Sequence, residues 1–250
     1  MTRLLNLTPI VLIAMLASAS PAVAQTGTVL GRGFIVVNGG YQVTGNDFEK
    51  TSTLRANAED GSFTSEYEVK GGPTFDVGGG VTLSRRFAIG AGLTRFSGST
   101  TSSLNGSVPH PFYFNHPRTV TGDVIGLSRA ELAVHVQAQV IAPVGPRLQF
   151  TVFGGPSFFK VDQELVTDFT WVDSYPFDEA SFGTASTLSA DGSSIGFNAG
   201  VDVAYFFTQR VGIGGLFQFS RASVEIEGAA VSQDVKAGGT RAGGGLRLRF

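Results

Sequence analysis

The chain has 250 residues, no cysteine and a formal net charge of −2, with 34 glycines, 21 phenylalanines and only 15% charged residues. The lack of cysteine excludes disulfide bonds and thiolate metal sites, and the small net charge excludes a strong basic field that would attract nucleic acid. Abundant glycine and aromatic residues with few charges are typical of small β-barrels, in which small side chains fill the lumen and aromatics face lipid.

The first 24 residues have the pattern of an export signal. Arg3 supplies a positive start, residues 4–19 are largely apolar, and a small-residue Ala-Val-Ala sequence stands before Gln25. This order predicts a secretory signal peptide over residues 1–24 that is cleaved before Gln25. The apolar run is too short to favour the alternative of an uncleaved membrane anchor. We expect the remaining residues, 25–250, to form one all-β domain.

Eight later segments alternate between apolar and polar residues, which is the periodicity of strands with two different faces. Short turns follow the second, fourth and sixth segments, whereas long polar stretches follow the first, third and fifth. Long loops at one end and tight turns at the other are typical of an outer-membrane barrel. The pattern therefore predicts an all-β, eight-stranded antiparallel up-and-down transmembrane β-barrel. The predicted strands cover residues 34–43, 74–83, 87–97, 124–141, 148–161, 194–207, 211–226 and 235–250.

Three stretches depart from this simple pattern. Residues 62–70 alternate well enough to form a strand that extends beyond a membrane. In the seventh strand the apolar parity changes near Val224, which indicates either a β-bulge or a strand that has left the membrane. Pro156, within the fifth strand, indicates a bulge or the outer end of that strand.

With the apolar faces turned outward, charged residues of both signs fall inside the barrel. An eight-stranded barrel is only wide enough for its own side chains, so these groups are desolvated and must pair. We expect the arginines to meet the acids in a structural network, with a satisfied histidine among them, rather than a proton or ion path. Which pairs form depends on the shear of the barrel. The predicted network consists of Asp76, Arg129, Glu131, His135, Asp202, Arg241 and Arg247.

Three cations fall on the lipid-facing side, late in the strands that run outward: Arg95, Lys160 and Arg221. A lipid-facing cation costs about 2–4 kcal/mol at the bilayer midplane and about 0–1 kcal/mol near the interface. These residues are therefore expected at the outer rim. There they either extend to water or contact lipid phosphates, including those of lipopolysaccharide where the outer leaflet contains it.

The second long loop contains Phe112, Tyr113 and Phe114 between prolines. This stretch could form an exposed patch for a partner, pack over the mouth of the barrel or touch the membrane surface, and we favour packing. His110 and His116 lie nearby but lack acidic or cysteine partners at a useful spacing, so we expect no metal site.

The signal segment, the hairpin over 75–96 with its Ser-Arg-Arg turn, the Gly-Gly-Pro-Ser sequence at 154–157 and the alternating residues 246–250 resemble the small outer-membrane β-barrel family of OmpA-like and OmpX-like proteins. The resemblance implies a Gram-negative outer-membrane location and no cofactor. It also implies that the barrel assembly machinery recognises the last strand, which ends in Phe250. The sequence ends with the barrel, so the peptidoglycan-binding domain of full-length OmpA-type proteins, and anchoring to the cell wall, are not expected.

These features predict a monomeric barrel with a plugged polar lumen, in contact with membrane lipid, that has a structural or surface-interaction role through its long outer loops. A narrow pore or small-solute or proton channel is one alternative, and a barrel enzyme acting on outer-membrane lipid is another. No nucleophile, histidine and acid stand at a recognisable spacing, and no glycine-rich phosphate loop opens a helix, so we expect no enzyme activity. A soluble lipocalin-like carrier is the remaining alternative for the fold.

Overall fold

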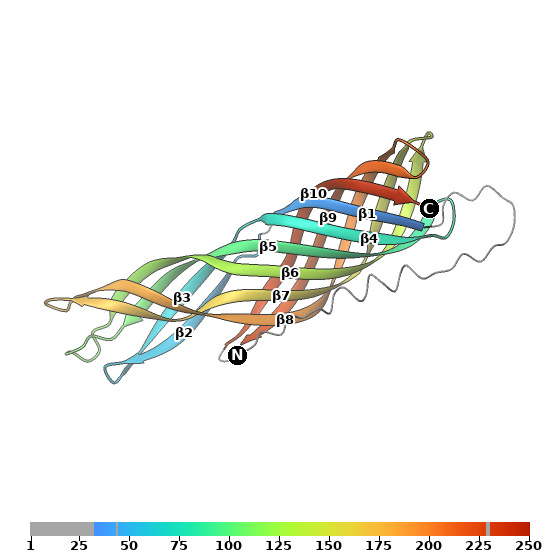
Figure 1. Ribbon diagram of the computed structural model, residues 1–250. Helices are drawn as coiled ribbons and strands as arrows, with labels where there is room; N and C mark the ends of the chain where they lie inside the picture. The colour runs from blue at the N-terminus through green and yellow to red at the C-terminus, as the bar shows by residue number, and fades with distance from the viewer. Residues whose placement is uncertain (1–32, 44, 229–230) are drawn as a thin grey trace, which may run out of the picture. The chain divides into compact units, whose positions relative to one another are not determined.

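A computed structural model describes residues 33–43, 45–228 and 231–250, which form an almost entirely antiparallel β structure (Figure 1). The predicted signal peptide lies outside the described residues. Within them, no helix is long and apolar enough to cross a membrane. The strands are β1 (Gly33–Val43), β2 (Phe48–Ala56), β3 (Glu59–Val69), β4 (Gly72–Thr82), β5 (Phe87–Val108), β6 (Arg118–Val144), β7 (Leu148–Ser174), β8 (Glu179–Phe206), β9 (Val211–Gly228) and β10 (Val231–Arg249).

Eight of these strands close into a barrel. The order is β1-β4-β5-β6-β7-β8-β9-β10, and β10 pairs back onto β1, so the ring has no free edge. Every pairing is antiparallel, and the short turns after β4, β6 and β8 lie at one end. The predicted eight-stranded antiparallel up-and-down barrel is confirmed.

The other two strands, β2 and β3, form a hairpin that extends the barrel wall at the end opposite the short turns. β4 pairs with the first half of β5, up to Phe96, and β3 pairs with its second half, from Thr100 to Ser107. β3 and β4 therefore lie end to end along β5, like one strand with a break between its two parts. The prediction that residues 62–70 continue as a strand is confirmed.

The change of parity near Val224 is not a bulge. β9 and β10 stay in one register from the pair Val211 and Leu248 to the pair Gly228 and Val231. Along the same inward face of β9, buried Gln218 and Ser220 give way to buried Ala222, Val224 and Ile226. The strand continues unchanged, and only the polarity of its inner face is reversed.

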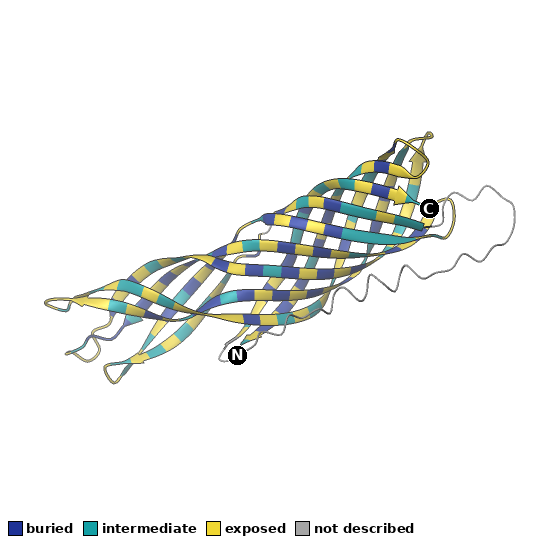
Figure 2. Ribbon diagram, in the orientation of Figure 1, coloured by how far each residue is buried: buried dark blue, intermediate teal, exposed yellow. Residues whose placement is uncertain are grey.

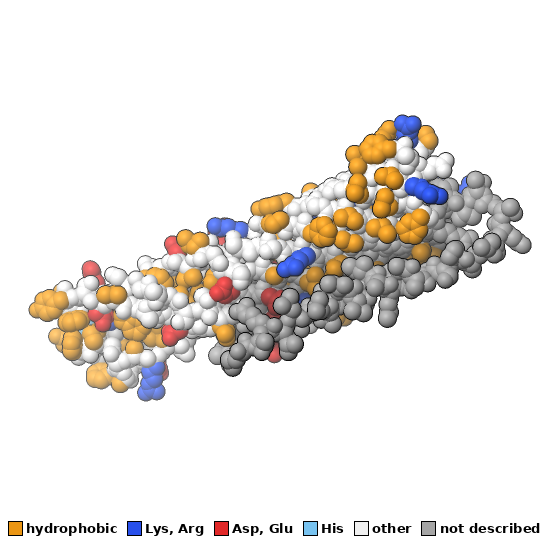
Figure 3. All heavy atoms as spheres, in the orientation of Figure 1, with side chains coloured by type: hydrophobic (Ala, Val, Ile, Leu, Met, Phe, Trp, Pro, Cys, Tyr) orange, Lys and Arg blue, Asp and Glu red, His pale blue; other side chains and the backbone are white. Residues whose placement is uncertain are grey.

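The same reversal divides the whole molecule into two levels. Buried and exposed residues alternate along the strands in both of them (Figure 2). In the part next to the short turns, which we call the body, polar residues face inward and large apolar residues face outward. In the part that we call the outer extension, residues 45–71, 99–128, 162–191, 222–228 and 232–237, apolar residues face inward. On the face in view, Figure 3 shows apolar side chains over the body and again at the far end of the outer extension, with carboxylates scattered over the outer extension.

Burial of apolar side chains, the dominant force in water, holds the outer extension together. The ring of Phe48 is stacked on Tyr67 with centroids 4.5 Å apart, and Phe63 meets Phe169 edge to face at 5.2 Å. The core contains residues from β3 and from every strand from β5 to β10. It includes Phe63, Tyr67, Leu104, Val108, Val120, Leu127, Leu165, Val166, Phe169, Val224, Ile226 and Val235.

Neither interpretation of Pro156 was right. Pro156 lies in the middle of β7 and pairs with Phe197 of β8 in an unshifted register. On the β6 side, the pairs Ala138 with Gly154 and His135 with Ser157 share one register, with the ladder interrupted between them. A local gap suits proline because it has no N–H to donate.

Candidate functional site

The predicted lumen residues point into the body at three successive levels. At the level nearest the short turns, the guanidinium of Arg247 pairs with the carboxylate of Asp202 and donates to Asn38 Oδ1 at 2.6 Å. Arg247 is 3% exposed. Its charge is therefore removed from water and depends on these partners for stabilisation.

The middle level is centred on Arg241. Its Nη1 lies 2.6 Å from Asp76 Oδ1, and its Nη2 donates to Gln218 Oε1 at 2.6 Å. The Thr94 hydroxyl donates to the same Asp76 oxygen at 2.6 Å and accepts from Arg241. Two donors on one carboxylate give Asp76 the partners that a buried charge requires.

His135 belongs to this middle level as a neutral ring. Because Thr94 gives its only proton to Asp76, the Thr94 oxygen can only accept from His135 Nε2, 2.9 Å away. His135 Nδ1 is then the acceptor for Ser157 Oγ at 2.7 Å, and Ser157 in turn accepts from Asn198 Nδ2 at 2.8 Å. Ser157 and His135 are 2% and 1% exposed, so this serine and histidine are out of reach of a substrate.

At the third level, where the body meets the outer extension, Arg129 and Glu131 pair with Nη2 and Oε1 2.8 Å apart. Arg129 also donates to Gln163 Oε1 at 3.2 Å and to the carbonyl of Lys236 at 2.6 Å. Glu131 Oε2 accepts from the Gly238 N–H at 2.9 Å. The apolar core of the outer extension lies directly beyond this level.

The structure thus brings all seven predicted lumen residues into contact with polar partners. The three ion pairs are Arg247 with Asp202, Arg241 with Asp76, and Arg129 with Glu131. Among the described residues, no group of three or more histidine, aspartate or glutamate side chains is arranged to hold a metal ion.

The three predicted rim cations do not form one cluster. Arg95 of β5 pairs with Leu132 of β6, and Leu132 pairs with Lys160 of β7. Two strand spacings place the backbones of Arg95 and Lys160 roughly 10 Å apart at one level of the outer wall. Lys160 Nζ lies 3.8 Å from Asp191 Oδ2, with both side chains exposed. Arg221 lies apart from them on β9, paired with Phe197.

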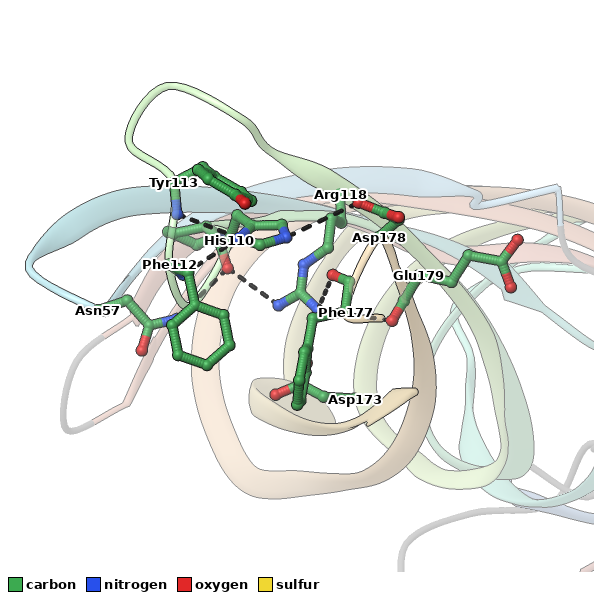
Figure 4. A network of polar contacts seen from close by, with 10 residues as sticks. Asn57, His110, Phe112, Tyr113, Arg118, Asp173, Phe177, Asp178 and Glu179 are labelled. Atoms are coloured by element: carbon green, nitrogen blue, oxygen red, sulfur yellow. Dashed lines mark hydrogen bonds and ion pairs between the residues drawn. The ribbon is translucent and has the colours of Figure 1, made fainter. Parts of the chain in front are cut away.

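Arg118, which the sequence pattern did not single out, joins two loops at the tip of the outer extension (Figure 4). From its position at the start of β6 it donates to Asp173 Oδ1 at 2.7 Å, and to the carbonyls of Phe177 at 3.1 Å and Pro109 at 3.0 Å. It is 5% exposed. The only signal in the sequence was a lone arginine after Pro117, and such a signal does not identify partners 55 residues away.

His110 shapes the first of these two loops. Its Nδ1 accepts the backbone N–H groups of Phe112 and Tyr113, both at 3.1 Å. The Nε2 atom is buried without a hydrogen bond and lies 4.0 Å from Asp178 Oδ1 on the other loop. The histidine therefore folds the aromatic stretch into a tight turn from inside.

The aromatic stretch itself does not pack over the barrel mouth, and that expectation was wrong. Phe112, Tyr113 and Phe114 are 68%, 63% and 70% exposed, and Tyr175 of the neighbouring loop is 88% exposed. The turn around His110 directs these rings outward, because the imidazole occupies the inner side of the turn. The rings of Phe112 and Phe177 meet edge to face at 5.1 Å, so the two loops share one aromatic surface.

Glu164 connects β6 and β7 where their backbone ladder ends. Its carboxylate accepts from the Thr187 hydroxyl at 2.6 Å and from the Ser128 N–H at 3.1 Å. The hydrogen bond from Thr187, followed by that from Ser128, lowers the pKa of Glu164 from its ordinary value. This half-buried carboxylate therefore holds the β7–β8 hairpin against β6 in its ionised form.

No family model and no curated protein matches the chain. Among solved structures, it is similar to Neisserial surface protein A (NspA), with 11% identity over 87% of this chain and 97% of that one and a TM-score of 0.42. It is similar to the attachment invasion locus protein Ail of Yersinia pestis, solved with the heparin analogue sucrose octasulfate, with 10% identity over 87% and 99% and a TM-score of 0.36. It is also similar to the outer membrane protease OmpT from Escherichia coli, with 7% identity over 90% and 99% and a TM-score of 0.46.

The architecture defines the class of protein. A single closed ring of antiparallel strands leaves no backbone edge unpaired, its outer wall is apolar, and its charges are paired inside. A β structure can cross lipid only as such a closed barrel. The chain has the fold of a small, closed, eight-stranded β-barrel of the kind that can cross a membrane, the architecture that the OmpA-like and OmpX-like resemblance implies.

Proposed function

We propose that this barrel does not conduct and that it acts at the cell surface through its outer extension. The observation that carries the proposal is the order of polar and apolar layers along the barrel axis. An ion would have to pass three levels of buried, paired charges and then an apolar core whose members Val161, Leu165 and Val224 are 0% exposed. Apolar constrictions oppose ion passage because an ion there loses its hydration.

Single-channel recording in planar bilayers tests this proposal. The purified full chain should insert without steady openings, and its insertion can be verified independently by heat-modifiable migration on a gel. A porin that is reconstituted in the same way provides the positive control for fusion. Steady unitary openings of the inserted barrel would overturn the proposal in favour of a narrow pore.

We further propose that the barrel has no catalytic role. The support is that the hydrogen-bonded Ser157 and His135 are buried, and that Thr94, not a carboxylate, orients the histidine. In a cell that lacks the protein, the acylation pattern of the outer-membrane lipids should be unchanged. A change that wild-type protein reverses, and that a Ser157→Ala variant does not, would contradict this.

Arg95 and Lys160 are proposed to contact lipid phosphates at the outer rim, since they stand at one level of the lipid-facing wall. Exchanging both for glutamine should reduce the lipopolysaccharide or anionic lipid that copurifies with the barrel. Arg221→Gln, which removes a solitary cation from β9, is the matched control. Equal lipid retention in all three proteins would mean that these side chains only extend to water.

A further inference from the structure

The exposed rings at the tip belong to one surface built from two loops, which we call the aromatic tip. It consists of Phe112, Tyr113 and Phe114 between β5 and β6, and Tyr175 and Phe177 between β7 and β8. Buried Arg118 fastens these loops together, because it binds carbonyls on both (Figure 4). The rings are therefore positioned before any partner arrives, so little ordering entropy is lost on binding.

The second loop has an unusual backbone conformation at Phe177. Phe177 has a φ of 81°, a region that side chains other than glycine rarely adopt. Its carbonyl is bound by Arg118, and its ring lies between Phe112 at 5.1 Å and Tyr175 at 5.9 Å. Backbone strain of this kind persists only where the surroundings enforce it, and it concentrates at functional sites.

The rings of the tip are left uncovered by the chain itself. Four of them are more than 60% exposed at the end of the molecule farthest from the short turns: Phe112, Tyr113, Phe114 and Tyr175. Elsewhere in the outer extension large apolar side chains are mostly buried in its core. Clustered exposed aromatic rings with fixed orientation are typical of protein–protein contact surfaces.

The charges around the tip determine the sign of its partner. Residues 173–179, which carry the second loop, contain three carboxylates and no lysine or arginine: Asp173, Asp178 and Glu179. Asp178, next to Phe177, has a side chain that is 75% exposed. Arg118, the cation that joins the two loops, is buried and already paired.

We propose that the aromatic tip binds a polypeptide segment that presents arginine or lysine side chains. A cation is attracted to the faces of tyrosine and phenylalanine rings, and a neighbouring carboxylate adds a charge-assisted hydrogen bond. An anionic lipid surface or a sulfated polysaccharide would be repelled by the same carboxylates. This inference rests on the proposed role of the outer extension at the cell surface.

Fluorescence anisotropy with the full chain in detergent micelles tests the inference, using a fluorescein-labelled arginine–glycine repeat peptide as the probe. The peptide should bind, and a glutamate–glycine repeat peptide should not. Phe112→Ala combined with Tyr175→Ala should weaken binding about tenfold, and Asp178→Asn combined with Glu179→Gln should do the same. Ile125→Ala and Asp234→Asn, exposed positions of the outer extension outside the tip, are matched controls that should bind as wild type does.

Three results would overturn the inference. The first is equal weakening by Asp234→Asn, which means diffuse attraction to an acidic surface rather than a site. The second is an unchanged affinity after both rings are removed, in variants that keep wild-type heat-modifiable migration. The third is tip-dependent binding to phosphatidylglycerol vesicles, or tip-dependent self-association, without peptide binding. Conductance is measured separately, so an open channel that still binds the peptide would overturn the proposed function and leave the tip site standing.

Discussion

Arg241 illustrates how the lumen tolerates charge at the scale of single residues. It is 4% exposed, and its guanidinium contacts Asp76, Thr94 and Gln218. Removing one partner of a buried ion pair leaves the other charge desolvated and unpaired, whereas replacing both partners by apolar groups can be nearly neutral. The pair is therefore expected to behave as a unit.

Arg241→Met should destabilise the folded barrel by about 3–5 kcal/mol, because it leaves the carboxylate of Asp76 buried without its cationic partner. The double variant with Asp76→Leu should recover much of that loss. The temperature at which the folded band converts to the unfolded band on a gel measures both effects. Arg210→Met, in an exposed short turn, is the control and should leave the transition in place. A double variant no more stable than Arg241→Met would contradict coupling of the two charges.

Arg118 is likewise a buried arginine with several acceptors, but it lies in the outer extension and joins loops instead of strands. Its Asp173 partner and three main-chain carbonyls come from both sides of the tip. Arg118→Lys retains the charge but loses the planar fork of donors that reaches these acceptors together. Under limited proteolysis the variant should be cleaved faster than wild type within residues 109–117 and 174–178, while the barrel stays intact. Wild-type cleavage rates would contradict the fastening role.

At the scale of elements, β1 and β10 close the ring through a seam of glycines. A Cβ on Gly245 would lie 1.8 Å from the carbonyl oxygen of Val37, so the two backbones approach more closely than any side chain permits. A Cβ on Gly39, on the lipid-facing side of the same seam, would have nothing within 4 Å. Close approach, not conformational freedom, explains the glycine at 245. Beside the seam, Gly33 and Phe250 exchange backbone hydrogen bonds of 2.9 and 3.0 Å. The role of Phe250 in assembly stays a prediction.

Gly245→Val should prevent closure of β10 on β1, and therefore assembly, while Gly39→Val should assemble normally. Both changes add the same atoms to the same pair of strands, so the comparison isolates steric access from strand propensity. The fraction of heat-modifiable protein after refolding into detergent is the measurement. Efficient assembly of Gly245→Val would mean that β1 and β10 can move apart far enough to accommodate the added side chain.

The β7–β8 hairpin depends on an ionised carboxylate where its ladder with β6 stops. The folded-state pKa of Glu164 is depressed by hydrogen bonds from Thr187 and Ser128, so its contribution to stability is present above the ordinary glutamate pKa of 4.5. That contribution is lost as the pH falls below this value through the folded pKa. The protection factors of the backbone amides in β7 beyond residue 163, which are corrected for the intrinsic exchange rate at each pH, should therefore fall below about pH 4.5. In Glu164→Gln this pH dependence should be reduced, and an unchanged profile would assign it to another group.

At the scale of the whole molecule, the same strands face lipid in the body and water in the outer extension. The body turns apolar residues toward lipid, and the outer extension turns them away from water, without a change of register in β9. The ladders of β7 with β8 and of β9 with β10 run through both levels, so it is mainly the side chains that differ between the two environments. The ends also differ in charge: the short turns carry Arg85, Arg86, Arg147 and Arg210 and no carboxylate.

Ile226→Asp should unfold the outer extension and spare the body. It places a charge in a core position that is 0% exposed, at a cost of at least about 2 kcal/mol. Ser223→Asp, at an exposed position of the same strand, is the control. Limited proteolysis should release fragments of the outer extension from Ile226→Asp alone, with the barrel core still heat-modifiable. Loss of the whole barrel would show that the two levels fold as one unit.

The sequence by itself determined the barrel, its eight strands, the end that carries the long loops and the inward face of each strand in the body. Alternation along a strand carries this information, because each residue reports whether its own face meets lipid or lumen. The same alternation predicted that Asp76, Arg129, Glu131, Asp202, Arg241 and Arg247 lie inside, but it could not pair them. Pairing depends on which residues of different strands come to one level.

Only the tertiary structure decided those pairs, the meaning of the parity change at Val224 and the construction of the tip. Arg118 and Phe177 are 59 residues apart, and they meet because the β5–β6 and β7–β8 hairpins end side by side. The rings at 112–114 read as apolar residues that should be covered, yet His110 and Arg118 hold them exposed. Contacts between hairpins arise from register and strand length together, and no local pattern in the chain encodes them.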